Sequence, residues 1–202
     1  MFDSKTFFHL IDPTKNIIVA YSGGGDSTAL LNYCYELKQE NHLKGSLSAI
    51  HVHHSISPHA DSWVMHCKKF CSERDIPLIC GSIKVDGKKS GLESAARQGR
   101  YEVFKQNISS SDQLLLAHHA DDVAETLMFR LFRGTGIDGL SGPIKSRKLG
   151  EGILLRPWLD YSKSILISYL VDRKLNYIED ESNAFNNQAR TYIRNEIIPL
   201  IS

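Results

Sequence analysis

Short apolar runs alternate with helical segments along this 202-residue chain, and this alternation limits its fold more than any other feature. We expect strands at Asn16–Tyr21, Leu47–His53, Pro77–Ile83, Gln113–Ala117 and Ile153–Leu155. We expect helices directly after the first strand and at Asp61–Arg74, Gly91–Gln106, His119–Arg133, Asp160–Lys174 and Thr191–Ile201. This order predicts an α/β fold with a doubly wound, mainly parallel five-stranded sheet that helices cover on both faces. The segment 134–148 carries four glycines and is expected to be irregular.

Length and composition are those of an ordinary globular domain. The net charge of +1 excludes a strongly basic surface, so any nucleic-acid binding requires a local patch. The four cysteines form no C-x-x-C pair, which favours a reducing compartment over a disulfide framework. No segment approaches the length of apolar sequence that a membrane span needs, so we expect a cytoplasmic protein without membrane contact.

The sequence Ser22-Gly23-Gly24-Gly25-Asp26-Ser27 lies between a buried strand and the start of a helix. Backbone N–H groups can converge there on an anion at the positive end of the helix dipole, and glycine permits a close approach. The loop lacks the lysine of a Walker A motif, so it favours pyrophosphate over a Walker-type phosphate grip. The alternative is a serine and glycine turn that only caps the helix.

Imidazoles and thiols gather near the second predicted strand. His51 and His53 share one strand face and, with His59, could bind a metal, but we favour lining of a nucleotide pocket. A second candidate metal group is His66 with Cys67 and Cys71, for which buried free thiols are the favoured alternative because no further pair completes a zinc site.

A second pole of the site is expected at His118–Glu125, where the fourth strand ends. The i, i+4 spacing brings His118 and Asp122 together, although acidic residues also favour any helix N-terminus. In the preceding helix, Arg97 and Arg100 are one turn apart, so either can point at phosphate.

The loop resembles the signature of the PP-loop ATP pyrophosphatases. Several further motifs, in order along nearly the whole chain, resemble the tRNA(Ile)-lysidine synthetase family: HVHHSISPHADSW, ESAARQGRYEVF, AHHADDVAETLMFRLFRGTGIDGLSGP, LLRPWLD, IEDESN and RNEIIP. The resemblance implies a Rossmann-like, adenine nucleotide alpha hydrolase-like fold. It further implies that residues 1–202 form the N-terminal PP-loop domain, without the C-terminal tRNA-binding domains in which family members continue.

The implied reaction joins the ε-amine of L-lysine to C2 of the wobble cytidine of the CAU-anticodon isoleucine tRNA. ATP first adenylates the C2 oxygen, releasing pyrophosphate, and lysine then displaces AMP; positioning and charge stabilisation carry most of the catalysis. By resemblance, the ATP-binding residues are Ser22, Gly23, Gly24, Gly25, Asp26 and Ser27. The implied catalytic residues are Asp26, Arg100, His118, Asp122 and Arg194, with Asp26 and Asp122 as ligands of Mg²⁺.

Other roles stay open at this stage. The acceptor for the lysine proton is His118, Asp122 or Glu125. A basic patch that contacts tRNA phosphates, or else only solvent, consists of Arg130, Arg133, Lys145, Arg147 and Lys148. The competing functions are a tRNA-thiolating enzyme, an amidotransferase subunit and a non-catalytic nucleotide- or tRNA-binding module, and a homodimer is possible.

Overall fold

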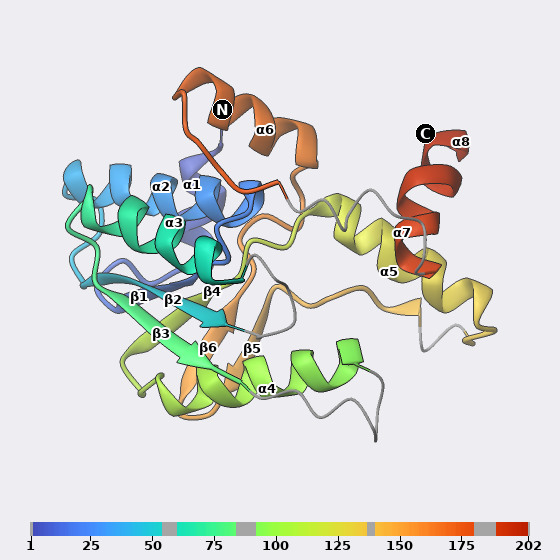
Figure 1. The fold of residues 1–202 in the computed structure, drawn as a ribbon, viewed down its shortest axis with the longest axis horizontal. Helices are drawn as coiled ribbons and strands as arrows, with labels where there is room; N and C mark the ends of the chain where they lie inside the picture. Colours follow the sequence, from blue (N-terminus) through green and yellow to red (C-terminus); the bar gives the residue numbers. More distant parts are fainter. Residues whose placement is uncertain (1, 54–59, 84–91, 137–139, 180–188, 202) are drawn as a thin grey trace.

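A computed structural model describes residues 2–53, 60–83, 92–136, 140–179 and 189–201. One sheet of six strands runs through the described part in the order β3-β2-β1-β4-β6-β5 (Figure 1). Its strands are β1 (Asn16–Ala20), β2 (Leu47–His53), β3 (Leu78–Ser82), β4 (Asp112–Leu115), β5 (Ser146–Leu149) and β6 (Gly152–Leu155). Among the strand pairs of the described residues, only β5–β6 is antiparallel. The predicted α/β class with a mainly parallel sheet is confirmed.

Helices cover both faces of this sheet. They are α1 (Ser4–Leu10), α2 (Gly25–Gln39), α3 (Ala60–Ser72), α4 (Leu92–Gln106), α5 (Ala120–Phe132), α6 (Lys163–Asp172), α7 (Ala189–Tyr192) and α8 (Ile198–Ile201), with a π-helical turn at Ile193–Ile197. In Figure 1, α1, α2, α3 and α6 lie above the sheet and α4 lies below it. No helix within the described ranges is both long and apolar enough to cross a bilayer.

Two hydrophobic clusters, one on each face, follow the period-two alternation of the strands. Val19 and Leu115 belong to the cluster under α2, whereas Ile18, Leu114 and Leu154 belong to the cluster against α4. The strands are therefore buried on both sides, as their continuous apolar sequences predict. The same alternation decides on which face the polar residues that follow β4 and β6 will lie.

The prediction of five strands is wrong, because residues 146–149 form a sixth. Ser146–Leu149 pairs antiparallel with β6 through a tight connection in which Gly150 has φ +57°. The expected irregular segment 134–148 therefore ends in a strand. This edge strand reads Ser-Arg-Lys-Leu, so it lacks the apolar run that marked the others, and its pairing to β6 is what makes it a strand.

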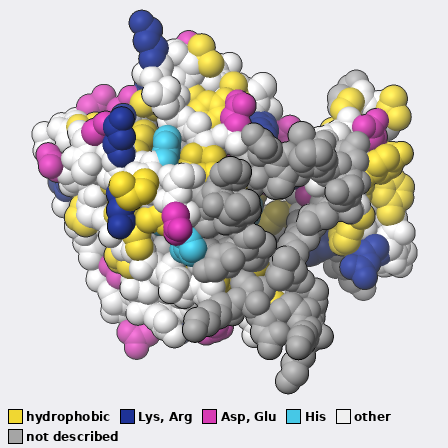
Figure 2. Space-filling view, viewed as in Figure 1, with side chains coloured by type: hydrophobic (Ala, Val, Ile, Leu, Met, Phe, Trp, Pro, Cys, Tyr) yellow, Lys and Arg dark blue, Asp and Glu magenta, His cyan; other side chains and the backbone are white. Residues whose placement is uncertain are grey.

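Helix α1 was not predicted from the sequence. Its Asp3 N-cap accepts hydrogen bonds from the backbone N–H groups of Lys5 and Thr6, and its Phe7 is buried in the core. At the other end of the chain, α7 and α8 stand beside α5, away from the sheet (Figure 1). Figure 2 shows apolar side chains on this part of the surface, where Tyr192 and Leu200 are exposed.

Candidate active site

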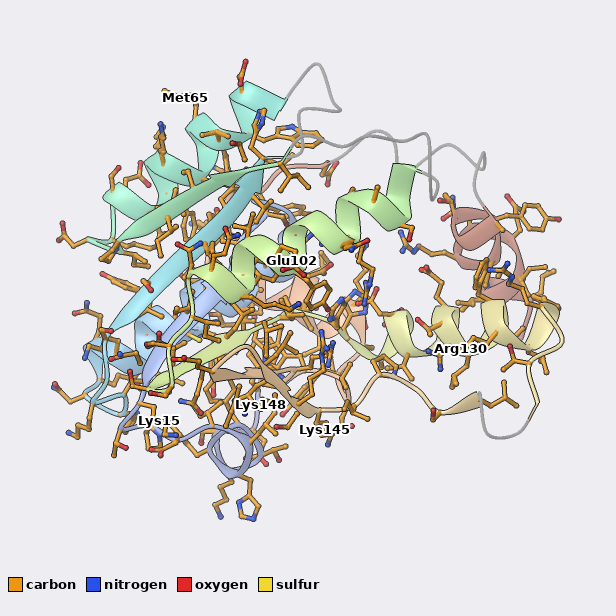
Figure 3. The ribbon with its side chains drawn as sticks, turned by 90° about the horizontal axis from the view of Figure 1, so that it is seen from below. Lys15, Met65, Glu102, Arg130, Lys145 and Lys148 are labelled. Carbon is orange, nitrogen blue, oxygen red and sulfur yellow. The ribbon has the colours of Figure 1, made fainter. Side chains whose placement is uncertain are left out.

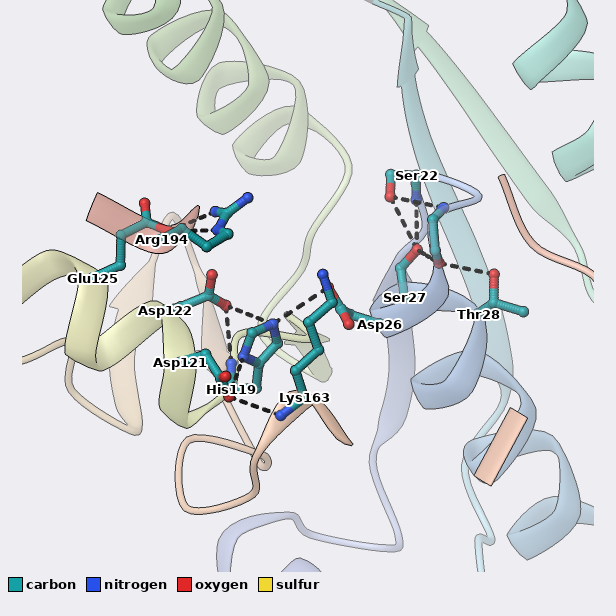
Figure 4. Close-up of polar contacts among 11 residues, drawn as sticks. Ser22, Asp26, Ser27, Thr28, His119, Asp121, Asp122, Glu125, Lys163 and Arg194 are labelled. Atoms are coloured by element: carbon teal, nitrogen blue, oxygen red, sulfur yellow. Dashed lines mark hydrogen bonds and ion pairs between the residues drawn. The ribbon is translucent and has the colours of Figure 1, made fainter. Parts of the chain in front are cut away.

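The loop between β1 and α2 has the geometry of an anion-binding turn. Gly24 is the N-cap of α2 and offers no side chain, so the first amides of a fifteen-residue helix remain open to a ligand. The loop is held by its serines: Ser27 Oγ lies 3.0 Å from Ser22 Oγ and donates to the Gly24 carbonyl at 3.0 Å (Figure 4). Ser22 is exposed at the mouth of this turn, whereas Ser27 is buried.

Gly23 is required by the loop for two independent reasons. Its φ is +90°, a conformation that L side chains rarely adopt. A Cβ at this position would also lie 2.5 Å from Cδ1 of Ile178 and 3.1 Å from Sγ of Cys67. The Gly23 carbonyl accepts a hydrogen bond from the Ile178 amide at 2.9 Å, which ties the loop to the segment after α6. The segment after α6 therefore holds the loop in place on this side.

His119 joins the loop to the helix start after β4. Its Nε2 lies 3.4 Å from Oδ2 of Asp26 and 3.6 Å from Oδ2 of Asp122, and its Nδ1 lies 3.4 Å from Oδ2 of Asp121 (Figure 4). Burial alone would lower the pKa of His119, but the hydrogen bond to Asp26 and the charges of all three carboxylates outweigh it and raise the pKa. The predicted second pole thus meets the loop, through a histidine that the resemblance did not single out.

Asp122 also fixes the start of α5. Its Oδ2 accepts a hydrogen bond from the His119 backbone N–H at 3.0 Å, which caps the helix. The capping role considered from the sequence and the site role therefore coexist in one side chain.

The carboxylates fit a cation that is shared with a phosphate ligand. Oδ1 of Asp26 is buried and accepts no hydrogen bond from any described residue, so it is free to coordinate. Within the described ranges, no three acidic, histidine or cysteine side chains form a metal site without further ligands. Mg²⁺ typically takes one or two carboxylates and completes its octahedron with water and substrate phosphates, and Asp26 and Asp122 meet that requirement.

His118 contacts Arg156. Arg156 Nε donates to Nδ1 of His118 at 3.1 Å. Burial lowers the pKa of His118 to about 4; the charge of Asp122 opposes this shift, and the charges of Arg156, Arg97 and Arg100 add to it. Neutral His118 accepts at Nδ1, so its proton is on Nε2 and the ring is a hydrogen-bond donor there.

Arg194 and Arg100, the other two catalytic residues that the resemblance implies, lie in different places. Arg194 donates from Nε and Nη2 to Oε2 of buried Glu125, at 2.9 and 2.5 Å, and so links the π-helical turn to α5 (Figure 4). Arg100 is exposed on α4, close enough for its charge to act on His118. The sequence contained no signal for the Arg194–Glu125 pair, because 69 residues separate its members.

The histidines of β2 do not form a metal site in the described part. His51 is buried beneath the loop, where Nδ1 lies 2.9 Å from the Tyr21 carbonyl and 3.4 Å from Cys67 Sγ. His53 Nε2 instead lies 3.3 Å from Asp61, and His59 is outside the described residues. His51 thus supports the loop from the core rather than lining an open pocket.

The cysteines are free thiols. Cys34, Cys67 and Cys71 are buried and Cys80 is exposed, so the expected burial of Cys67 and Cys71 is confirmed. Burial raises the pKa of Cys67 to about 12 and that of Cys71 to about 11.

The five residues of the predicted basic patch do not gather in one place. Figure 3 shows Arg130 on α5, well apart from Lys148 on β5. Arg130 donates to the Ser141 carbonyl, and Lys145 pairs with Asp160. The guanidinium of Arg133 lies 5.3 Å from the Phe129 ring centroid, and that of Arg147 lies 4.8 Å from the centroid of Tyr101. Arg147 therefore belongs to another group, with residues of α4.

Curated relatives match most of this chain. A tRNA(Ile)-lysidine synthase of Pseudomonas fluorescens (strain Pf0-1) is 44% identical over 91% of the chain, and one of Haemophilus influenzae (strain PittEE) is 41% identical over 92%. The matched regions are 41% and 43% of those proteins, so the chain spans about two fifths of their length.

Solved structures support the fold. The U34-tRNA thiolase NcsA from Methanococcus maripaludis superposes with a TM-score of 0.78 at 17% identity, covering 98% of this chain and 71% of that one. The NH3-dependent NAD synthetase from Campylobacter jejuni gives a TM-score of 0.54 at 12% identity, covering 90% and 79%. The family model of the PP-loop domain matches residues 3–201. With its clamped glycine loop between β1 and α2, the chain belongs to the PP-loop family of ATP-binding domains.

Proposed function

We propose that this chain is the ATP-binding, nucleotide-modifying domain of a tRNA(Ile)-lysidine synthetase. In this function, the C2 oxygen of the wobble cytidine in a CAU-anticodon isoleucine tRNA is adenylated, and the ε-amine of L-lysine then displaces AMP. The observation that carries the proposal is the identity of 41–44% to named synthases over more than nine tenths of the chain, which spans both poles of the site.

The loop residues would bind and orient the nucleotide. The open amides at the start of α2 suit the pyrophosphate end of ATP, with Ser22 at the mouth of the loop. Gly23, Gly24 and Gly25 keep that approach free of side chains. Asp26 and Asp122 would hold Mg²⁺, which neutralises phosphate charge when it is bound.

His119 would set the positions of these carboxylates. The nearby carboxylates raise the pKa of His119, which favours its protonated ring, and that charge would offset the repulsion between Asp26 and Asp122. His119 is thus a positioning residue, and its role is separate from that of His118.

His118 suits hydrogen-bond donation better than proton abstraction. Its Nδ1 is occupied by Arg156, and the nearby arginines oppose a further positive charge on the ring. A donor at Nε2 could stabilise the negative charge that develops on the C2 oxygen or the α-phosphate. Of the three candidate acceptors for the lysine proton, His118 is therefore the weakest.

Glu125 and Asp122 remain as groups that would receive the lysine amine. Glu125 is buried one turn after Asp122 on α5, and Arg194 holds its Oε2. A carboxylate fixed in this way would orient an ammonium group, and Asp122 would stand closer to the loop for the proton.

The test is incorporation of radiolabelled lysine into CAU-anticodon isoleucine tRNA by this chain. We expect incorporation that requires ATP and releases one pyrophosphate per lysine. Asp26→Asn should reduce the rate by at least about 100-fold, as removal of a charge-stabilising group does. Sulfur transfer to the tRNA, or ammonia in place of lysine as the nucleophile, would contradict the proposal.

The cysteines argue against the alternative function, thiolation of tRNA. Sulfur transfer requires accessible, low-pKa thiols. Three of the four cysteines are buried, and the pKa values of Cys67 and Cys71 are raised, so no thiol suited to that chemistry stands at the loop.

A further inference from the structure

Three arginines surround one tyrosine between α4 and the edge of the sheet. The guanidinium of Arg97 lies 5.3 Å from the Tyr101 ring centroid, and that of Arg147 lies 4.8 Å from it. Arg97 Nη2 also donates to the Tyr101 hydroxyl at 3.5 Å. Arg156, buried at 4% exposure, contacts the Ile144 carbonyl at 2.7 Å and His118 at 3.1 Å. We call Arg97, Tyr101, Arg147 and Arg156 the arginine cluster.

The alternation of the strands places this cluster on the α4 face. Arg156 follows β6 with the same parity as Leu154, whose side chain packs against α4. Arg147 is the direct antiparallel partner of Leu154, so it shares that face. His118 likewise has the parity of Leu114. His119, one residue on, turns to the opposite face and meets Asp26.

No acidic side chain within the described residues balances the positive charge of the cluster. Among the described acidic residues, none forms an ion pair with Arg97, Arg147 or Arg156. Clustered like charges repel, and buried charges in proteins are normally paired. Burial would raise the pKa of Tyr101, but the arginines outweigh it and lower the pKa, so the local field favours an anion. A missing anionic partner is therefore expected here.

We propose that the arginine cluster binds a backbone phosphate of the RNA substrate, next to the nucleotide that reacts. The inference rests on the proposed function, because it takes that RNA to be the substrate. Guanidinium groups match phosphate oxygens with paired donors, and RNA recognition of single strands combines such contacts with aromatic faces. Arg97 is exposed and Arg147 half-buried, so an RNA strand can reach them from outside.

The phosphates of ATP are the less suitable occupants. Their loop opens at the start of α2, which packs on the face of the sheet opposite α4 (Figure 1). An RNA phosphate at the cluster would put His118 between that phosphate and the site of adenylation. The cluster would then fix how deeply the cytidine enters.

The experiment measures binding of a fluorescein-labelled RNA stem-loop with a CAU loop, by anisotropy, without ATP or lysine. Arg97→Ala and Arg147→Ala should each weaken binding about 10-fold and lower the slope of log Kd against log salt by about one. Lys148→Ala is the matched control: it removes the same charge from the same strand, but its side chain lies on the opposite face. We expect it to change affinity less than about twofold. Arg147→Lys, which keeps the charge and loses the fork, should fall between.

Titration of each variant with ATP identifies the source of the anion. Unchanged ATP affinity with weakened RNA binding supports the proposal. Equal RNA losses in Lys148→Ala and Arg147→Ala, or a loss confined to ATP, would overturn it. Circular dichroism melts show whether a variant is folded, and Arg147→Lys supplies the comparison if Arg147→Ala is not. The binding experiment does not depend on ligation. Arginine-dependent RNA binding, combined with no lysine transfer in the radiolabelled-lysine test, would therefore contradict the proposed function and leave this site supported.

Discussion

Replacing Gly23 by alanine should destabilise the domain far more than the same change at the neighbouring Gly24. Gly23 has φ +90°, and a non-glycine residue held in such a conformation costs about 1–3 kcal/mol. The new methyl would also stand 2.5 Å from Cδ1 of Ile178, and overpacking of this kind costs about 1–3 kcal/mol more. The two effects add to roughly 2–6 kcal/mol.

Gly24 offers a control within the same loop. Its φ is −70°, and a Cβ there would meet Ser22 Oγ at an ordinary 3.5 Å. Gly24→Ala should therefore change the free energy of unfolding by less than about 1 kcal/mol, because alanine also restricts the unfolded chain. Urea unfolding followed by circular dichroism measures the free energy of unfolding of both variants. In thermal melts of a chain of this length, Gly23→Ala should lower Tm by roughly 10 °C.

Ile178 separates the two contributions at Gly23. In an Ile178→Ala background the overlap is gone and the φ strain remains, so Gly23→Ala should cost about 1–3 kcal/mol there. If Gly23→Ala is as mild as Gly24→Ala, or if its cost is unchanged by Ile178→Ala, the clamped-loop reasoning is refuted.

Further predictions concern charge, thiols and helix packing. The pKa of His118 is lowered to about 4 in the folded chain. Below pH 6.5 the unfolded chain therefore binds a proton at His118 that the folded chain does not bind until about pH 4. The free energy of unfolding should fall by roughly 2–3 kcal/mol between pH 7 and 4. His118→Gln should remove that part of the pH dependence in urea melts, and equal slopes in both proteins would contradict it. In the native state one thiol, Cys80, should react with Ellman's reagent at pH 8, and four should react in urea; fast native labelling of Cys67 would contradict its burial. Glu36→Gln should lower the free energy of unfolding by about 1 kcal/mol in urea melts, because Glu36 on α2 accepts hydrogen bonds from Arg173 after α6 at 2.6 and 3.0 Å. An unchanged midpoint would show that the pair is not stabilising.

The buried strands could be predicted from the sequence because each carries its signal locally. β1 and β2 are continuous apolar runs, and their predicted bounds agree with the structure to within a residue. β5 carries no such signal, since Ser-Arg-Lys-Leu becomes a strand only through the hydrogen bonds that β6 offers. An edge strand is defined by its partner, which a reading along the chain does not contain.

The residues of the site also divide into those with a local sequence signal and those that only the fold brings together. The loop Ser22–Ser27 is contiguous, so its residue types and its place between strand and helix predicted an anion-binding turn. The arginine cluster draws on α4, β5 and the end of β6, and only the register between Arg147 and Leu154 shows that its members share a face. In the predicted basic patch, Arg130 lies apart from Lys148, and contact of the patch residues with tRNA stays a prediction.

The two adjacent histidines show what helical spacing alone could not predict. Helical i, i+4 spacing paired His118 with Asp122, but α5 begins at Ala120, so both histidines still lie in extended backbone, where neighbours point to opposite faces. His119 consequently meets Asp26 and Asp122, and His118 meets Arg156. His119 thus lies at an acidic pole, with Asp26 and Asp122, and His118 lies at a basic pole, with Arg156. In the proposed function, the reaction of ATP with an RNA base would need both poles within reach of one reacting oxygen, and the end of β4 is where this fold brings them together.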